Sequence, residues 1–217
     1  MIFKFDISAI FKGFYFRCLI ITLGLLGHIP SSFADTRILI LGDSLSASYS
    51  MQQKDGWVSL LQQLYDQRKE GIILINASIS GETTAGGLAR LDKILDTQKP
   101  DVVLIELGGN DGLRGFPPKK AKQNLLQIIE KAKAKDILPA LMQIRIPPNF
   151  GKRYTQMFEG IYPKLAEQTN VALVPFFMEI VVAKSGMILA DGIHPNKKAM
   201  PIIRDFMDKE ILKLVGR

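Results

Sequence analysis

The amino-acid sequence predicts a three-layer α/β/α sandwich around a five-stranded parallel sheet. Two observations favour this fold. Short runs of Ile, Leu and Val recur along the chain, and such near-continuous apolar runs are typical of parallel strands buried on both faces. Segments with helical spacing separate these runs. Strands that alternate with helices through right-handed crossovers leave helices on both faces of the sheet.

Each predicted strand is one of these aliphatic runs. The strands are predicted at residues 37–41, 72–76, 102–106, 137–143 and 171–174. Helices are predicted between and after them, at residues 57–69, 84–97, 118–135, 154–168 and 195–215. In the first helix the apolar residues follow the helical period, at Leu60, Leu61, Leu64 and Tyr65. For five strands we expect the flavodoxin-like order 2-1-3-4-5.

The N-terminus has the layout of a secretory signal peptide. Three basic residues, Lys4, Lys12 and Arg17, precede an apolar stretch at 18–26, and small residues stand at the −3 and −1 positions of a cleavage site after Ala34. A membrane anchor is the alternative, but the apolar run is about half of the roughly 20 residues that span a bilayer. We therefore expect residues 1–34 to be removed and residues 35–217 to form one exported, periplasmic domain.

Composition and charge exclude several classes of protein. With 47% hydrophobic and 23% charged residues, the chain resembles a folded globular protein and not a disordered or membrane-embedded one. The net charge is +7, and six lysines crowd one predicted helix without interleaved aromatic residues: Lys119, Lys120, Lys122, Lys131, Lys133 and Lys135. This pattern is typical of a solvated helix face. We expect no nucleic-acid partner and at most weak contact with a membrane surface.

Small and polar residues collect where the predicted strands end. They follow the first three strands at residues 42–45, 77–83 and 107–111, and precede the last helix at 191–195. In an open parallel sheet these segments meet at the carboxyl edge, where ligands bind. The sequence therefore predicts a functional site at that edge.

The residues in these segments could perform acyl transfer. Ser44 ends a strand, where a sharp turn can expose its hydroxyl, and His194 is the single His of residues 35–217. Asp191, three residues earlier, can orient the imidazole. The amides of Ser44 and Gly81 and the carboxamide of Asn110 are candidate donors to an oxyanion.

Taken singly, each of these residues has a simpler explanation. A Ser after a strand is commonly a helix cap or turn residue, and Gly-Gly-Asn is commonly a turn. Asp-x-x-His could be half of a metal site, but residues 35–217 hold no other His and no Cys, because Cys18 lies in the predicted signal peptide. These residues alone therefore do not predict a metal site.

Together, the four segments resemble the SGNH (also called GDSL) hydrolase family. Its Ser, Gly, Asn and His are matched in order by Ser44 in G-D-S-L, Gly81, Asn110 in G-G-N-D, and His194 in D-G-I-H-P. The G-x-S-x-G elbow of α/β-hydrolases is absent, because Ser46 replaces its second Gly. Longer stretches at 76–83, 106–115, 142–146 and 175–179 look like those of bacterial periplasmic esterases and thioesterases of the family.

The resemblance implies the SGNH hydrolase fold and a serine hydrolase that forms an acyl-enzyme. Implied substrates are small acyl esters and thioesters, such as acyl-CoA thioesters, lysophospholipids and aryl esters, cleaved without metal or cofactor. One departure from the family's pattern is Ser48, where glycine is expected. A hydroxymethyl group there could stiffen the loop that follows the nucleophile.

The expected acyl-binding residues are apolar side chains on loops beside the site: Leu113, Phe116, Ile146, Pro147 and Phe150. The alternative is that they bury in the core or against one another. Two other functions also remain open: a carbohydrate O-deacetylase of the same fold, and a catalytically silent lipid-binding protein. We expect the domain to act as a monomer.

Overall fold

The centre of the fold is a five-stranded, all-parallel sheet in a computed structural model that describes residues 35–217. The sheet order is β2-β1-β3-β4-β5, as the sequence predicts. The strands are β1 (Thr36–Gly42), β2 (Ile72–Asn76), β3 (Val102–Glu106), β4 (Leu138–Met142) and β5 (Ala172–Val174). The predicted signal peptide, residues 1–34, lies outside the described residues.

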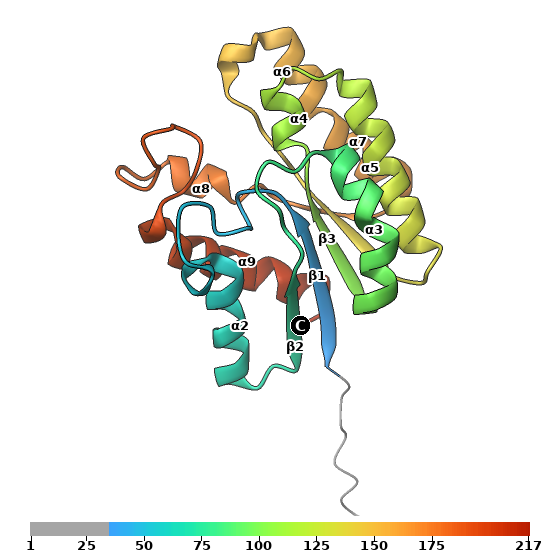
Figure 1. The fold of residues 1–217 in the computed structure, drawn as a ribbon, viewed down its shortest axis with the longest axis vertical. Helices are drawn as coiled ribbons and strands as arrows, with labels where there is room; N and C mark the ends of the chain where they lie inside the picture. Colours follow the sequence, from blue (N-terminus) through green and yellow to red (C-terminus); the bar gives the residue numbers. More distant parts are fainter. Residues whose placement is uncertain (1–34) are drawn as a thin grey trace, which may run out of the picture. The chain divides into compact units, whose positions relative to one another are not determined.

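Helices cover both faces of the sheet. Helices α2 (Trp57–Arg68) and α9 (Met200–Leu214) pack together on one face. Helices α3 (Thr84–Gln98), α5 (Pro118–Lys133) and α7 (Ile161–Thr169) pack on the other, as Figure 1 shows. This arrangement confirms the predicted three-layer sandwich. Within residues 35–217, no helix has the length and apolarity to cross a membrane.

The core is built on the two central strands. Residues 38–41 of β1 have no exposed surface, and all five residues of β3 are buried. A fully buried Ile or Leu side chain contributes about 1.5–3 kcal/mol relative to an exposed one. Burial thus stabilises the central strands, and the loops at their carboxyl ends start from stable positions.

The prediction of a single helix at 154–168 is wrong. The structure has two helices there, α6 (Lys152–Glu159) and α7, which are separated by Gly160. Pro163 has no N–H to continue the helical ladder to the carbonyl of Glu159, and that carbonyl instead accepts a hydrogen bond from Gln143 Nε2 at 3.2 Å. The chain therefore turns at this point and starts a new helix.

Several shorter elements were not predicted. The last helix begins at Met200 and not at residue 195, and a 3₁₀ turn, η3 (Lys197–Ala199), precedes it. Two one-turn helices lie in segments expected to be loops, α4 (Gly109–Leu113) and α8 (Met178–Val182). Two further 3₁₀ turns are η1 (Gln53–Asp55) and η2 (Pro148–Phe150). Helices α4 and α8 both lie beside the predicted site.

Candidate active site

The turn after β1 projects Ser44 from the carboxyl edge of the sheet. Ala47 N–H donates to the Asp43 carbonyl at 2.9 Å, which closes the turn, and Asp43 Oδ1 accepts a hydrogen bond from Leu45 N–H at 3.1 Å. Only a glycine fits at position 42, because a Cβ there would lie 2.5 Å from Glu106 Oε2. The chain can therefore pass close to β3 and then expose the Ser44 hydroxyl.

Ser44, His194 and Asp191 form a hydrogen-bonded series. Ser44 Oγ lies 2.8 Å from His194 Nε2, and His194 Nδ1 lies 2.8 Å from Asp191 Oδ2. Nucleophile, imidazole and carboxylate are thus in the relative positions that a serine triad requires. The structure brings together three residues that the sequence places up to 150 positions apart.

The loop that carries Asp191 and His194 is itself fixed by hydrogen bonds. Leu189 N–H donates to the His194 carbonyl at 2.8 Å. The backbone N–H groups of His194 and Ile193 donate to Asp191 Oδ1, both at 3.0 Å, and lower the pKa of Asp191 to about 2. Asp191 therefore carries its negative charge at neutral pH and can stabilise the imidazolium.

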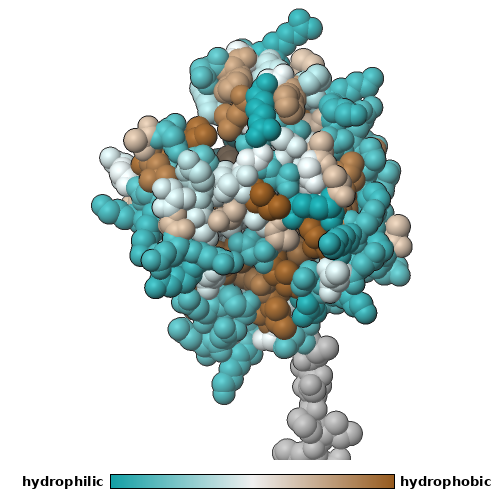
Figure 2. All heavy atoms as spheres, viewed as in Figure 1, coloured by the Kyte–Doolittle hydropathy of each residue, from teal (hydrophilic) through white to brown (hydrophobic). Residues whose placement is uncertain are grey.

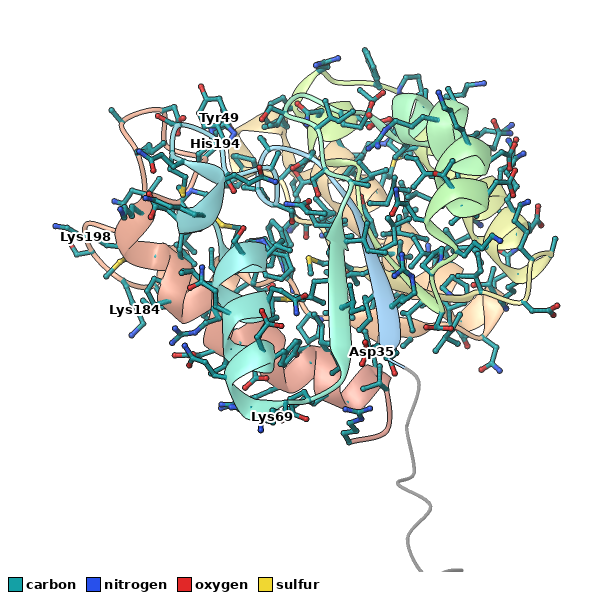
Figure 3. All side chains as sticks on the ribbon, turned by 60° about the horizontal axis from the view of Figure 1, so that its bottom comes forward. Asp35, Tyr49, Lys69, Lys184, His194 and Lys198 are labelled. Carbon is teal, nitrogen blue, oxygen red and sulfur yellow. The ribbon has the colours of Figure 1, made fainter. Side chains whose placement is uncertain are left out.

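An aromatic ring that was not predicted covers the imidazole. The rings of Tyr49 and His194 stack with centroids 4.0 Å apart and planes 25° apart, and Figure 3 shows the two residues together. Both neighbours of Tyr49, Ser48 and Ser50, have a φ of 60°, in the left-handed region. Such a conformation costs roughly 1–2 kcal/mol for a non-glycine residue, which explains why glycine is expected at position 48.

The other two predicted oxyanion donors, Asn110 and Gly81, lie in segments at the carboxyl edge of the sheet. Asn110 is in the first turn of α4, and its Nδ2 donates to Asp43 Oδ2 at 3.1 Å. Gly81 has a φ of 79°, and its carbonyl accepts a hydrogen bond from Arg114 Nη2 at 3.0 Å. Asn110 lines the cavity beside Ser44, whereas Gly81 lies outside that lining.

A cavity of about 390 Å³ opens beside Ser44. Its walls are largely apolar. They include residues of α4, of α8 and of the segments after β4 and β5: Leu113, Ile144, Ile146, Pro147, Pro148, Phe176, Met178 and Val182. In Figure 2 the surface is hollowed between the part that holds α8 and the part that holds α4 and α6. Arg145 also lines the cavity and pairs with Glu179 and Glu159.

Of the five predicted acyl-binding residues, three line the cavity and two lie outside its lining. Leu113, Ile146 and Pro147 line it, but Phe116 and Phe150 do not. Phe116 is 42% exposed, and Phe150 packs against Tyr154, with ring centroids 6.4 Å apart. The prediction missed the contribution of α8. The stretch 175–179 resembles the family, but the sequence pattern does not place Met178 and Val182 beside the site.

The described part of the chain has no group of three His, Cys, Asp or Glu side chains placed to hold a metal ion. The site consists of a hydroxyl, an imidazole, a carboxylate and amide donors beside an apolar cavity. These groups can form and hydrolyse an acyl-serine bond.

Comparison with known proteins agrees with this geometry. The model of the GDSL-like Lipase/Acylhydrolase family matches residues 40–200. An arylesterase of Vibrio mimicus is 50% identical over 183 residues, which are 84% of this chain and 92% of the relative. Thioesterase 1/protease 1/lysophospholipase L1 of Escherichia coli (strain K12) is 50% identical over 183 residues, 84% of this chain and 86% of the relative.

A solved structure has the same fold. The psychrotrophic esterase EstA from Pseudoalteromonas sp., determined in a form inhibited by monoethylphosphonate, superposes with a TM-score of 0.82 at 52% sequence identity. The match covers 84% of this chain and all of that chain (100%).

Proposed function

The chain belongs to the GDSL-like lipase/acylhydrolase family and is a hydrolase of esters and thioesters, and we propose that it cleaves them through an acyl-enzyme formed on Ser44. The observation that carries this proposal is the series from Ser44 Oγ through the His194 ring to Asp191, with both contacts at 2.8 Å. No residue outside this series needs to move a proton.

The first half of the reaction forms the acyl-enzyme. Ser44 Oγ attacks the acyl carbonyl carbon, and its proton passes to His194 Nε2. Asp191, ionised and bonded to Nδ1, stabilises the resulting imidazolium. The imidazolium then gives its proton to the thiol or alcohol as the bond to the carbonyl carbon breaks.

The second half releases the acid. Water gives a proton to His194 and attacks the acyl-serine carbonyl, and the Ser44 oxygen regains that proton as it leaves. In both halves the carbonyl oxygen becomes negatively charged. The Ser44 and Gly81 amides and the Asn110 carboxamide are the donors that we assign to this oxygen.

The cavity supports an acyl chain as the group that is bound. Its lining is mainly aliphatic, and Trp57, the single Trp of the chain, is 1% exposed and donates to Ser46 Oγ. Trp57 is therefore out of reach for stacking on a sugar ring, which argues against a carbohydrate O-deacetylase. The intact triad argues against a catalytically silent lipid-binding protein.

We predict that kcat/KM rises from acetyl thioesters to thioesters of medium chain length and then levels off. Each methylene that enters the cavity contributes up to about 0.8 kcal/mol. The test is a series of acyl thioesters from two carbons upward, each assayed below its critical micelle concentration. A preference for acetyl would contradict an acyl-binding cavity and favour the deacetylase.

A pair of variants tests whether the rise of kcat/KM with chain length comes from the cavity. Val182 lines the cavity and is 63% exposed, so Val182→Ser leaves the core intact and should flatten the rise with chain length. Leu138, at the amino end of β4, is 51% exposed and lies away from the cavity lining. Leu138→Ser should keep the wild-type rise.

We also propose that residues 1–34 direct export to the periplasm and that the remaining domain acts as a monomer. The signal-peptide layout of the sequence supports export, and the triad and cavity are supplied by one chain. N-terminal sequencing of the periplasmic protein should begin at Asp35. A start at Met1 would contradict cleavage.

A further inference from the structure

Two acidic side chains are buried together beneath the turn that carries Ser44. Asp43 is 2% exposed and Glu106 has no exposed surface. Parallel pairing of β1 with β3 sets Gly42 opposite Glu106, so Asp43 follows directly beside the end of β3. The Asp43 N–H donates a hydrogen bond to Glu106 Oε2, so the two acidic residues lie against each other. Two adjacent buried carboxyl groups disfavour a charge on both, so one of them is expected to keep a proton.

The contacts of Asp43 require a carboxylate. Its Oδ1 accepts a hydrogen bond from Leu45 N–H, and its Oδ2 accepts one from Asn110 Nδ2, both at 3.1 Å. Both oxygens are thus occupied as acceptors. A proton on either oxygen would compete with the N–H group that it already binds.

The contacts of Glu106 accommodate the proton. Its Oε2 accepts hydrogen bonds from Ser46 Oγ at 2.9 Å and from Asp43 N–H at 3.2 Å. Its Oε1 is buried, and no donor among residues 35–217 reaches it. A proton on this oxygen would displace no existing hydrogen bond, so Oε1 is the position that we assign to the proton.

The electrostatics agree with this assignment. Burial raises the pKa of Asp43 to about 6, although hydrogen bonds from Leu45 and Asn110 and the charge of His194 oppose the rise. Burial and the neighbouring Asp43 raise the pKa of Glu106 well above its usual range. The other ionisable groups that interact with the pair are His194 and the buried phenol of Tyr162, whose pKa is also raised by burial.

We propose that Glu106 is a neutral carboxylic acid beside the Asp43 carboxylate, and that this pair positions Asn110 for the oxyanion. Asp43 holds one N–H of the Asn110 carboxamide, which leaves the second N–H for the substrate oxygen. Asp43 and Glu106 are positioning residues, because neither touches the reacting atoms. The catalytic part of this inference rests on the proposed function, whereas the location of the proton does not.

Two isosteric substitutions give opposite expected results. In Glu106→Gln an NH₂ group replaces the protonated oxygen, so the side chain stays neutral, and its oxygen still accepts from Ser46. The variant should keep kcat and KM close to wild type. In Asp43→Asn one acceptor oxygen becomes NH₂, so either Leu45 or Asn110 loses its partner. Its kcat should fall by about tenfold to a hundredfold with little change in KM, as for a misplaced catalytic group.

The pH dependence of kcat and Tm shows whether Glu106 holds a proton or the pair has only a structural role. Deprotonation of Glu106 at alkaline pH would leave two buried negative charges, so wild-type kcat should decline there, and Glu106→Gln should lack this decline. The stability of the wild-type fold should also fall as the pH rises. The folded state keeps a proton that the unfolded chain releases near the ordinary pKa of a carboxyl group, so the stability falls above that pH. The Tm difference between Glu106→Gln and wild type should widen with pH in favour of the variant.

Infrared spectroscopy tests the proton without any turnover. The carbonyl stretch of an un-ionised carboxylic acid should persist in the wild-type protein at pH 8 and disappear in Glu106→Gln. Absence of this band in wild type would overturn the proposal, whatever the role of Ser44. A large loss of kcat in Glu106→Gln with full activity in Asp43→Asn would overturn it too, because it would place the proton on Asp43. Equal losses of kcat and Tm in both variants would reduce the pair to a structural contact.

Discussion

The Ser44→Ala variant is expected to lose turnover almost completely while it keeps its fold. Removal of the nucleophile of a serine hydrolase typically lowers kcat by about a millionfold. Ser44 is partly exposed on a turn that is closed by backbone hydrogen bonds and by Asp43, so loss of its hydroxyl leaves no core cavity. Within residues 35–217, the hydrogen bond that its side chain makes is the one to His194 Nε2.

The measurement is kcat on an acyl thioester together with the Tm of both proteins. Ser80→Ala is a matched control, because Ser80 is an exposed serine on the loop after β2 and is absent from the cavity lining. The control should keep wild-type kcat. Retention of even a tenth of the wild-type kcat in Ser44→Ala would remove Ser44 from the mechanism.

The Asn110→Ala variant is expected to lower kcat by roughly a hundredfold or more, the usual effect of deleting one oxyanion donor. The carboxamide lines the cavity beside Ser44, and its hydrogen bond to Asp43 orients it before the substrate arrives. KM should change little, because the bond to the oxygen strengthens only as negative charge develops there.

A second asparagine provides the contrast. Asn170 ends α7 with a φ of 50°, at the amino end of β5 and so at the opposite edge of the sheet. Asn170→Ala should lower stability by about 1 kcal/mol, because alanine resists the left-handed conformation. Its kcat should remain unchanged. If Asn110 were only a turn residue, Asn110→Ala would lower Tm and keep kcat, as Asn170→Ala does.

The sheet order and the triad could be predicted from the sequence because both depend on local patterns. Aliphatic runs identify buried parallel strands, and parallel strands place all their carboxyl ends at one edge. Ser44 and Asn110 directly follow β1 and β3, which are neighbours in the sheet. Their proximity therefore follows from topology, before any side-chain packing is known.

Other features depend on register and packing, which the sequence pattern does not contain. The contact between Asp43 and Glu106 requires the pairing of Gly42 with Glu106, and the stacking of Tyr49 on His194 requires two serines with left-handed backbone. The cavity wall that α8 forms depends on where this short helix packs after the edge strand β5. Only the break at Gly160 had an overlooked signal, since Pro163 excludes a continuous helix.

The acyl-enzyme on Ser44 is tested most directly by covalent labelling with a fluorophosphonate, which reacts with the activated serine of a hydrolase. We predict that intact-mass spectrometry of the wild-type protein shows one adduct, that peptide mapping places it on Ser44, and that Ser44→Ala gains no mass under the same conditions. An adduct on another residue, or equal labelling of Ser44→Ala, would contradict the assignment of Ser44 as the nucleophile.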